Sequence, residues 1–293
     1  MKTIPLTVMV REGPMARAYL GVMRLLGMRP ERILLLVFSH DQGSGKPVAR
    51  WLPPGFRRTV AARHQDARLN HWVRRLRKEH PDITSMVMGT IARRFNLPVS
   101  VFDEMTALAD YSQYADEVRV VFVAGLRDKA LATELADLGR ATILFTGGGM
   151  VPPSLFDVPG LRFIHVHPGY LPHVRGSDGV LWSTLVRGRP GASCFFMVPG
   201  LDLGDIVDRR EFEPLSFDLG AHDRPDDMTL YRMVFASYDP MLRARMLGDV
   251  LLSNDGDIAA AQARAQESEA GGTYHFMHRA LRGEALARIF TVD

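Results

Sequence analysis

The sequence predicts an α/β fold built on a doubly wound, mostly parallel sheet, with a small helical C-terminal extension. Near-continuous apolar runs, such as residues 32–40 and 141–149, are typical of strands that are buried on both faces of a parallel sheet. Such runs alternate with helical patterns through most of the chain, which favours βα units. After residue 205 the alternation weakens and helical patterns prevail.

Each element follows from its local pattern of apolar residues, glycines and prolines. Strands are expected at residues 6–10, 32–40, 97–102, 118–125, 141–149 and 161–169, and again from residue 191. Helices are expected at residues 15–27, 59–95, 127–139 and 228–252, the last one bent near Pro240, and residues 257–272 are interpreted as helix followed by loop.

The composition indicates one large domain, or one domain with a small appendage. The 293 residues are 46% hydrophobic and 24% charged, with a formal net charge of +3, so a packed core is expected. The single cysteine, Cys194, cannot form an internal disulfide, which suits a reducing compartment. The N-terminal stretch lacks the apolar core of a signal peptide, and no apolar run approaches the roughly 20 residues of a membrane helix. We therefore expect a cytoplasmic protein without membrane contact.

Residues 1–225 are expected to form the main domain and residues 226–293 the helical extension. The Arg-rich segment 74–78 is interpreted as a solvated helix face, so nucleic acid is not expected as a partner. The Gly-Ser-Gly-Lys segment at 43–46 lacks the spacing of a phosphate-binding loop and precedes Pro47, which excludes that motif.

Two neighbouring strand ends carry the residues with the clearest chemical potential, because ligands in open α/β sheets gather beyond the carboxyl ends of strands. Gly147, Gly148 and Gly149 end one strand; they form a tight turn or let the backbone approach a flat ligand, and the residues alone favour neither. His165 and His167 end the next strand and, at spacing i and i+2, point to the same face.

A turn at residues 199–200 precedes two aspartates, Asp202 and Asp205. A carboxylate near an imidazole can fix its tautomer and support its protonated form. His165, His167 and Asp202 therefore predict either a catalytic group or a set of metal ligands.

These segments resemble the folate-dependent formyltransferase family, which includes glycinamide ribonucleotide, methionyl-tRNA and amino-sugar formyltransferases. The family signature reads approximately Asn-x-His-Pro-Ser-x-Leu-Pro-x-x-Arg-Gly, then Gly-Val-Thr, then Leu-Asp-x-Gly-Asp-Ile. Residues 165–176 and 191–207 are similar to it. Residues 146–169 are similar to the segment that lines the family's folate pocket, and residues 229–247 to the helix after the catalytic region. The resemblance covers about residues 141–245.

The resemblance implies a Rossmann-like formyltransferase fold, 10-formyltetrahydrofolate as the formyl donor, and no metal. The implied folate-binding residues are Gly147, Gly148, Gly149, Met150 and Val151.

The resemblance also implies a catalytic trio of asparagine, histidine and aspartate. His167 matches the histidine and Asp202 the aspartate, whereas His165 stands where the family has asparagine. Gly169 replaces the serine of the signature. The first half of the chain is longer than is usual in the family, which implies an insertion within residues 44–120.

In this chemistry an amine attacks the formyl carbon, and negative charge develops on the formyl oxygen. We expect His167 to donate to that oxygen and Asp202 to hold His167 protonated. His165 would be a further donor, but an imidazole donates only in the right tautomer or when charged. We therefore expect His165 to make transfer sensitive to pH between about 6 and 8, and His165→Asn to remove that sensitivity.

The predicted function is formyl transfer to the amine of a small metabolite, either an amino sugar or an amino-acid derivative. The region after residue 252 is too short and too helical for the β-barrel appendage of methionyl-tRNA enzymes. Three alternatives stay open: a formyl-folate hydrolase, a metal-dependent hydrolase using His165, His167 and Asp202, and a non-catalytic relative. The sequence is compatible with a homodimer.

Overall fold

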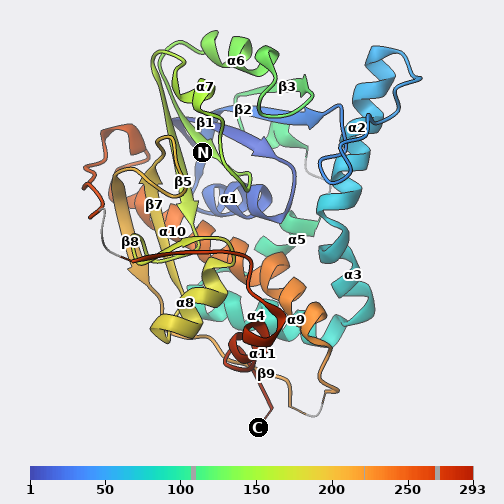
Figure 1. Ribbon diagram of the computed structural model, residues 1–293, viewed down its shortest axis with the longest axis vertical. Coiled ribbons are helices and arrows are strands. Elements are labelled where there is room, and N and C mark those ends of the chain that lie inside the picture. Colours follow the sequence, from blue (N-terminus) through green and yellow to red (C-terminus); the bar gives the residue numbers. More distant parts are fainter. Residues whose placement is uncertain (107–109, 221, 268–270, 293) are drawn as a thin grey trace.

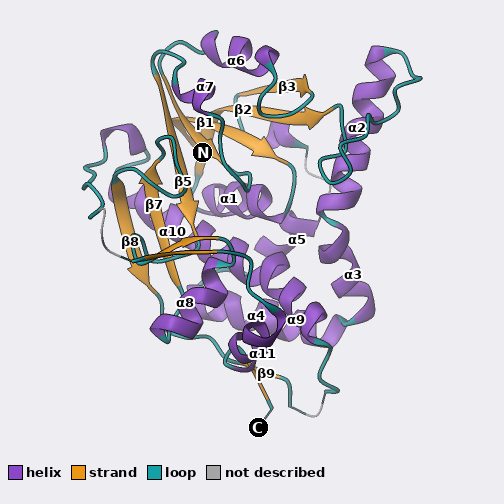
Figure 2. Cartoon of the chain, viewed as in Figure 1, coloured by secondary structure: helices purple, strands orange, loops and turns teal. Residues whose placement is uncertain are grey.

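A computed structural model describes residues 1–106, 110–220, 222–267 and 271–292. A seven-stranded sheet with helices on both faces forms its centre (Figure 1, Figure 2). In spatial order the strands are β3 (Glu117–Val123), β2 (Met28–Phe38), β1 (Lys2–Arg11), β4 (Ala141–Phe145), β5 (Leu161–His167), β7 (Gly191–Phe196) and β8 (Ile206–Glu211). The first five run parallel, and β7 is antiparallel to β5 and β8. The predicted mostly parallel α/β sheet is therefore confirmed.

Side chains of the central strands enter two hydrophobic clusters, one on each face of the sheet. Val8 packs in one cluster and the adjacent Met9 in the other, as alternation along a strand requires. The first cluster is covered by α1 (Pro14–Leu25) and α10 (Asp239–Ser253), and the second by α6 (Lys129–Ala136) and α7 (Pro153–Phe156). Burial on both faces explains why these strands are apolar almost throughout.

The segment between β2 and β3 is helical, and its first helix projects from the body of the molecule (right in Figure 1). Its helices are α2 (Pro54–Leu69), α3 (His71–Glu79), α4 (Pro81–Phe95) and α5 (Val101–Thr106). Arg17 of α1 is 1% exposed, and its guanidinium lies 2.8 Å from Glu12 and 2.9 Å from Asp66 of α2. A buried guanidinium is costly without such partners. The end of α2 is thus fixed beside the β1–α1 turn.

The strand predicted at residues 97–102 is wrong: this region forms a turn followed by α5. Val101, Phe102 and Met105 of α5 are all buried, with helical rather than alternating spacing. Such a short apolar run does not distinguish strand from helix, and packing against α1 decides the outcome.

The chain after residue 226 is mostly helical, as predicted, and the helix expected at 228–252 is bent. It consists of α9 (Asp227–Met233), a π-helical segment η2 (Val234–Tyr238), and α10, in which Pro240 is the second residue. The other elements are η1 (Tyr111–Gln113), β6 (Val174–Gly176), α8 (Gly179–Arg187), β9 (Phe217–Asp218), η3 (Ile258–Ala260), β10 (Gly272–Tyr274), α11 (Arg279–Ala287) and β11 (Phe290–Thr291). Because α10 shares a hydrophobic cluster with α1, the division of domains at residue 225 stays a prediction.

The helix expected at the start of residues 257–272 is wrong for the described part of that segment, which contains only the short η3. Arg264 instead exchanges two backbone hydrogen bonds of 2.8 Å with Ile206, so the segment runs along β8. An alanine-rich sequence without an apolar stripe gains little from tertiary packing as a helix. No helix in the described ranges is long and apolar enough to cross a membrane.

Candidate active site

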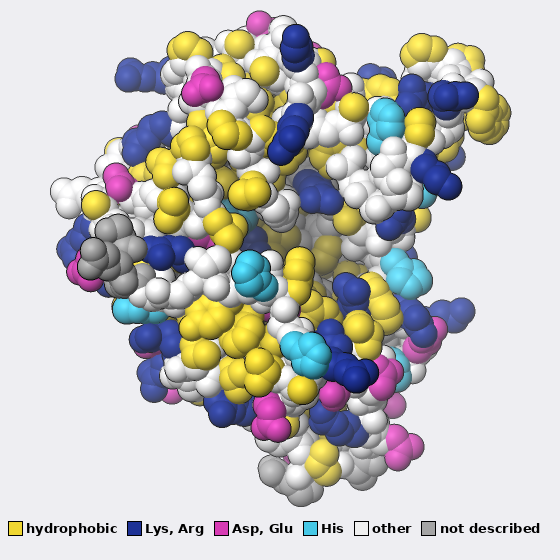
Figure 3. Space-filling model, in the orientation of Figure 1, with side chains coloured by type: hydrophobic (Ala, Val, Ile, Leu, Met, Phe, Trp, Pro, Cys, Tyr) yellow, Lys and Arg dark blue, Asp and Glu magenta, His cyan; other side chains and the backbone are white. Residues whose placement is uncertain are grey.

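A cleft of about 520 Å³ lies at the carboxyl ends of β1, β4 and β5. The strand order reverses between β1 and β4, and this is where ligands bind in open α/β sheets. Figure 3 shows the molecule hollowed near the centre of this face. The cleft brings together His165, His167 and Asp202 with Gly147–Gly149. Met150 is exposed and Val151 is buried in the second hydrophobic cluster, so their role in ligand binding stays a prediction.

The buried His167 pairs with the part-buried Asp202. His167 is 3% exposed, its Nε2 lies 2.9 Å from the carbonyl oxygen of Val174, and its Nδ1 lies 3.5 Å from Oδ2 of Asp202. The contact with Val174 requires a proton on Nε2. Burial lowers the pKa of His167, although the charge of Asp202 acts in the opposite direction. The neutral ring therefore presents an unprotonated Nδ1, which can accept a proton and then pair with Asp202 as an imidazolium.

The loop between β7 and β8 holds Asp202 in place. Asp202 has φ 52°, in the left-handed region, and its Oδ2 accepts a 2.7 Å hydrogen bond from the amide of Gly176. The side-chain amide of Gln266 donates to the carbonyl oxygens of Asp202, at 3.0 Å, and Gly204, at 2.8 Å. The carboxylate is thus positioned by β6 and by the C-terminal segment.

His165 differs from the sequence-based expectation in its protonation state and in its hydrogen bonds. Its Nδ1 donates to the carbonyl oxygen of Phe145 at 2.9 Å, so its Nε2 carries a lone pair, and this atom lies 3.5 Å from Nη2 of Arg243. Burial and the charge of Arg243 lower the pKa of His165 to about 3. The ring stays neutral at physiological pH. The expected charge change between about pH 6 and 8 is therefore wrong.

Arg243 is the cleft residue that sequence reasoning missed. This arginine of α10 is 8% exposed, its Nε donates to the hydroxyl of Tyr19 at 3.3 Å, and its Nη1 lies 3.8 Å from Oδ1 of Asp239. Both Asp239 and Arg243 line the cleft. Burial raises the pKa of Asp239 to about 6, and the charge of Arg243 acts against that rise. The available signal was a pair of charged residues four apart at the start of α10, although Arg245 and Asp249 form a second such pair in the same helix.

The glycine segment has room for a flat ligand. A Cβ on Gly148 or Gly149 would meet no atom within 4 Å, whereas one on Gly147 would lie 2.6 Å from the ring of Phe145. Gly148 and Gly149 therefore present open backbone to the solvent side. This observation fits the approach of a folate ring system.

Gly169 explains the second departure from the signature. A Cβ at this position would lie 2.7 Å from Nε2 of His167 and 2.4 Å from the carbonyl oxygen of Val174. A serine here would therefore disturb the hydrogen bond that sets the tautomer of His167.

Within the described ranges, no three His, Cys, Asp or Glu side chains are grouped so as to hold a metal ion. Both nitrogens of His165 face protein groups, namely the carbonyl of Phe145 and the guanidinium of Arg243. His165 thus offers no nitrogen to a site shared with His167 and Asp202.

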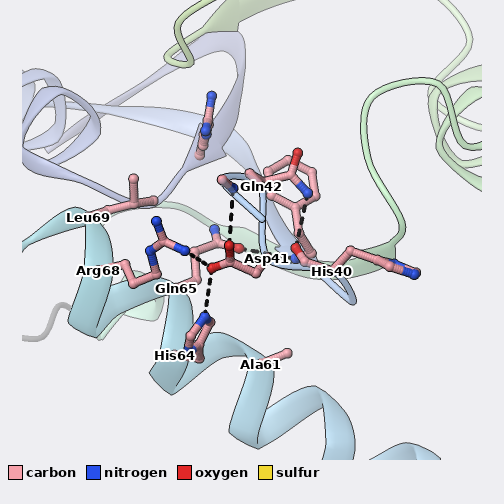
Figure 4. A pocket seen from close by; sticks show the side chains of 11 residues that line it. His40, Asp41, Gln42, Ala61, His64, Gln65, Arg68 and Leu69 are labelled. Carbon is pink, nitrogen blue, oxygen red and sulfur yellow. Dashed lines mark hydrogen bonds and ion pairs between the residues drawn. The ribbon is translucent and has the colours of Figure 1, made fainter. Parts of the chain in front are cut away.

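A smaller pocket of about 260 Å³ adjoins the cleft and shares Arg11 and Leu69 with it (Figure 4). Asp41, just after β2, accepts hydrogen bonds from the amides of Gly43 and Ser44 and contacts both His64 and Arg68 of α2. The contacts with His64 and Arg68 hold the pKa of Asp41 well below its usual range.

Arg11 gives this pocket a cation whose charge is not compensated by a carboxylate. Its Nη1 donates to the carbonyl oxygen of Gly148 at 3.3 Å, while its Nε is buried without a hydrogen-bond partner. Among the described residues, none of the ion pairs includes Arg11. The wall beside it includes the apolar side chains of Phe38 and Ala61.

No family model matches this chain. The chain is 29% identical over 187 residues to the methionyl-tRNA formyltransferase of Syntrophus aciditrophicus, which covers 55% of this chain and 59% of that protein. It is 29% identical over 116 residues to the methionyl-tRNA formyltransferase of Ruminiclostridium cellulolyticum, covering 39% of this chain and 36% of the relative. The chain therefore spans about three fifths or less of these curated relatives.

Among solved structures, a sugar N-formyltransferase from a Shewanella species aligns with 98% of this chain and 87% of its own, at 11% identity and a TM-score of 0.46. With so low an identity and TM-score, this structural similarity says nothing about the function of the chain. Over part of its length, the chain is similar to methionyl-tRNA formyltransferases.

Proposed function

We propose that this protein transfers the formyl group of 10-formyltetrahydrofolate to the amine of a small, anionic metabolite. The observation that carries the proposal is the pair of His167 and Asp202, which lies in one cleft with the open backbone of Gly148 and Gly149. The matches to methionyl-tRNA formyltransferases support the reaction class. A homodimer and a cytoplasmic location stay predictions.

The pair supports a proton-transfer role. The amine nitrogen attacks the formyl carbon, a C–N bond forms, and the π electrons of the carbonyl move to its oxygen. Nδ1 of His167 accepts the proton that the amine loses, and Asp202 pairs with the resulting imidazolium. The bond from the formyl carbon to folate N10 then breaks, N10 receives the proton from His167, and the carbonyl re-forms. The products are an N-formyl amine and tetrahydrofolate, and one proton has passed through His167.

This role differs from the one expected from the sequence. His167 was expected to act as a protonated donor, but burial favours its neutral form. A neutral imidazole is suited to take a proton from an amine that becomes acidic during attack. Asp202 stabilises the charged form that follows, at a distance of 3.5 Å between Oδ2 and Nδ1.

The pocket beside Arg11 favours an acceptor with a carboxylate or phosphate. Arg11 ends β1, which is two strands from β5 in the sheet, so the backbones of these two strands lie on the order of 10 Å apart at about 4.8 Å per strand. Guanidinium groups bind carboxylate and phosphate strongly because their donors match both anions. An amino-sugar phosphate or an amino-acid derivative with a free carboxylate fits this description.

The test is to incubate the protein with 10-formyltetrahydrofolate and individual amines, namely amino-sugar phosphates, neutral amino sugars and amino acids. Release of tetrahydrofolate and a mass increase of the amine by one formyl group would support the proposal. Tetrahydrofolate release at the same rate without any amine, and with no formylated product, would favour the hydrolase. No release under any condition would favour a non-catalytic relative.

A further inference from the structure

We propose that Arg243 donates to the formyl oxygen during transfer, and that His165 is a positioning residue that holds the Arg243 guanidinium in the cleft. The pair takes the place of the asparagine that the family has at position 165. This inference rests on the proposed formyl transfer. It assigns a catalytic role to a residue outside the signature.

The starting point is the direction in which His165 faces. Its Nδ1–H is committed to the carbonyl oxygen of Phe145 at 2.9 Å. Its Nε2 then bears a lone pair and accepts from Nη2 of Arg243 at 3.5 Å. A neutral imidazole in this tautomer has no second N–H. It therefore cannot donate to a formyl oxygen, as an asparagine amide would.

Arg243 has the donors that His165 lacks. A guanidinium carries five N–H groups, of which Nε has one and each terminal nitrogen two. Tyr19 engages Nε at 3.3 Å, Asp239 lies 3.8 Å from Nη1, and His165 lies 3.5 Å from Nη2. One N–H on each terminal nitrogen remains after these contacts. Since Arg243 lines the same cleft as His167, these donors belong to the cavity where the reaction is proposed.

The surroundings of Arg243 leave its charge available. Asp239 is its carboxylate partner among the described residues, and the separation of 3.8 Å is long for an ion pair. Burial raises the pKa of that carboxyl to about 6, and the charge of Asp202 also acts on the guanidinium. Arg243 is itself 8% exposed. A fixed cationic donor in such a site needs little reorganisation when negative charge appears on a substrate oxygen.

The step adds no proton transfer to the mechanism. As the amine attacks, charge moves to the formyl oxygen, and the free N–H groups of Arg243 donate to it. When the bond to N10 breaks, the electron pair returns to the carbonyl. Arg243 keeps all of its protons throughout, and His167 alone carries the proton from the amine to N10.

The experiment measures tetrahydrofolate release from 10-formyltetrahydrofolate, with and without the best amine of the panel. Removing Arg243 alone would leave Asp239 buried without its partner, so the test variant is Arg243→Met with Asp239→Asn. It should lose roughly 10²-fold or more in kcat while its Kd for tetrahydrofolate stays within about twofold. Asp239→Asn alone is the matched control for the loss of the carboxylate. Arg243→Lys, which keeps a charge but not the fork of donors, should fall between the two.

Position 165 tests the positioning role. His165→Ala should lower kcat about tenfold without changing the Kd for tetrahydrofolate, because the guanidinium loses its fixed acceptor. His165→Asn is then added to the Arg243→Met, Asp239→Asn variant. The resulting kcat should rise at least to that of the His165→Ala single variant, since an amide can donate directly to the formyl oxygen. Rescue by asparagine but not by alanine in that background supports the exchange of donors.

Two outcomes overturn the inference while the proposed function stands. One is a parent protein that transfers formyl groups while the Arg243→Met, Asp239→Asn variant keeps kcat within about threefold of Asp239→Asn. The other is a long-range ¹H–¹⁵N spectrum that shows a proton on Nε2 of His165, since Arg243 could then not donate to it. The spectrum reports the tautomer of His165 even if the parent protein has no activity. Absence of activity in the parent would instead contradict the proposed function.

Discussion

The chain pairs a histidine with an aspartate at two places near the sheet's carboxyl edge, and the two pairs are built differently. Near β2, Asp41 is held by two backbone amides, by His64 and by Arg68, and His64 is 42% exposed. At the end of β5, Asp202 accepts one backbone amide, and His167, 3.5 Å away, is 3% exposed. The first carboxylate is saturated with partners and organises a loop. The second carboxylate, 13% exposed, has fewer partners, so it can still stabilise a proton on His167.

The largest expected effect comes from breaking the β5 pair. His167→Ala and Asp202→Asn should each lower kcat by roughly 10²-fold or more, and the double variant should be little worse than either because the two act as a unit. Asp205→Asn, an equal change on the same loop at an exposed position, should keep full activity. Steady-state rates and thermal unfolding of all four proteins check this. Additive losses in the double variant would remove Asp202 from the proposed role.

The next effect concerns the pocket near β2. Arg11→Leu should raise KM about tenfold or more for acceptors with a phosphate or carboxylate, because a charge-assisted hydrogen bond is lost. KM for neutral amines should stay the same. Arg24→Leu, on an exposed arginine of α1, controls for the change in net charge. Equal effects of Arg11→Leu on charged and neutral acceptors would show that this pocket does not select an anion.

The third effect concerns folding stability, which should depend on pH in different ranges for the site at the end of β5 and for the pocket near β2. His165 has a pKa of about 3 in the folded protein, against about 6.5 when unfolded, so the folded state binds fewer protons and stability falls as pH drops below about 6.5. The lowered pKa of Asp41 has the same sign but acts at lower pH: its contribution to stability is complete above its unfolded pKa of about 3.9 and is lost only below it. Between about pH 4 and 6.5, the loss therefore comes from the buried histidines, whereas Asp239, with its pKa raised to about 6, acts in the opposite direction.

Urea unfolding at about pH 7.5 and pH 5 measures this difference. His165→Asn removes one titrating group from the cleft, so its midpoint should fall less between the two values than that of the parent. The remaining slope should come largely from His167, whose pKa burial also lowers. Identical slopes for the variant and the parent would mean that His165 is not held neutral.

The smallest effect is expected from Asp41→Asn. The amides of Gly43 and Ser44, which donate to Asp41 at 3.1 and 2.7 Å, should exchange faster with solvent. Because His64 and Arg68 are about half-exposed, global unfolding should change little. Hydrogen exchange followed by mass spectrometry resolves this loop from the rest. Slower unfolding of the loop or loss of protection across the whole sheet would contradict a local role.

The features that could be predicted from the sequence are those that short, continuous segments determine. The sheet follows from apolar runs, and His167 and Asp202 follow from short segments with fixed spacing. The failure at residues 97–102 has the same origin, because six residues do not carry enough period to separate strand from helix.

What could not be predicted depends on contacts between distant elements. The tautomer of His165 is set by a carbonyl of β4, 20 residues away, and its lone pair by an arginine 78 residues away. The side chains that shape the small pocket come from β1, β2 and α2. No spacing rule connects such residues until the sheet and helices have been assembled.

The π-helical segment Val234–Tyr238 decides which side of its helix the cleft meets. Tyr231, Phe235, Asp239 and Arg243 all line the cleft at steps of four residues. In a regular α-helix each such step drifts about 40° around the axis, and a wider turn takes up part of that drift. Deleting one residue from this segment would turn Arg243 by about 100°, away from His165. The contact between His165 and Arg243 therefore depends on the length of this segment as well as on the two residues themselves.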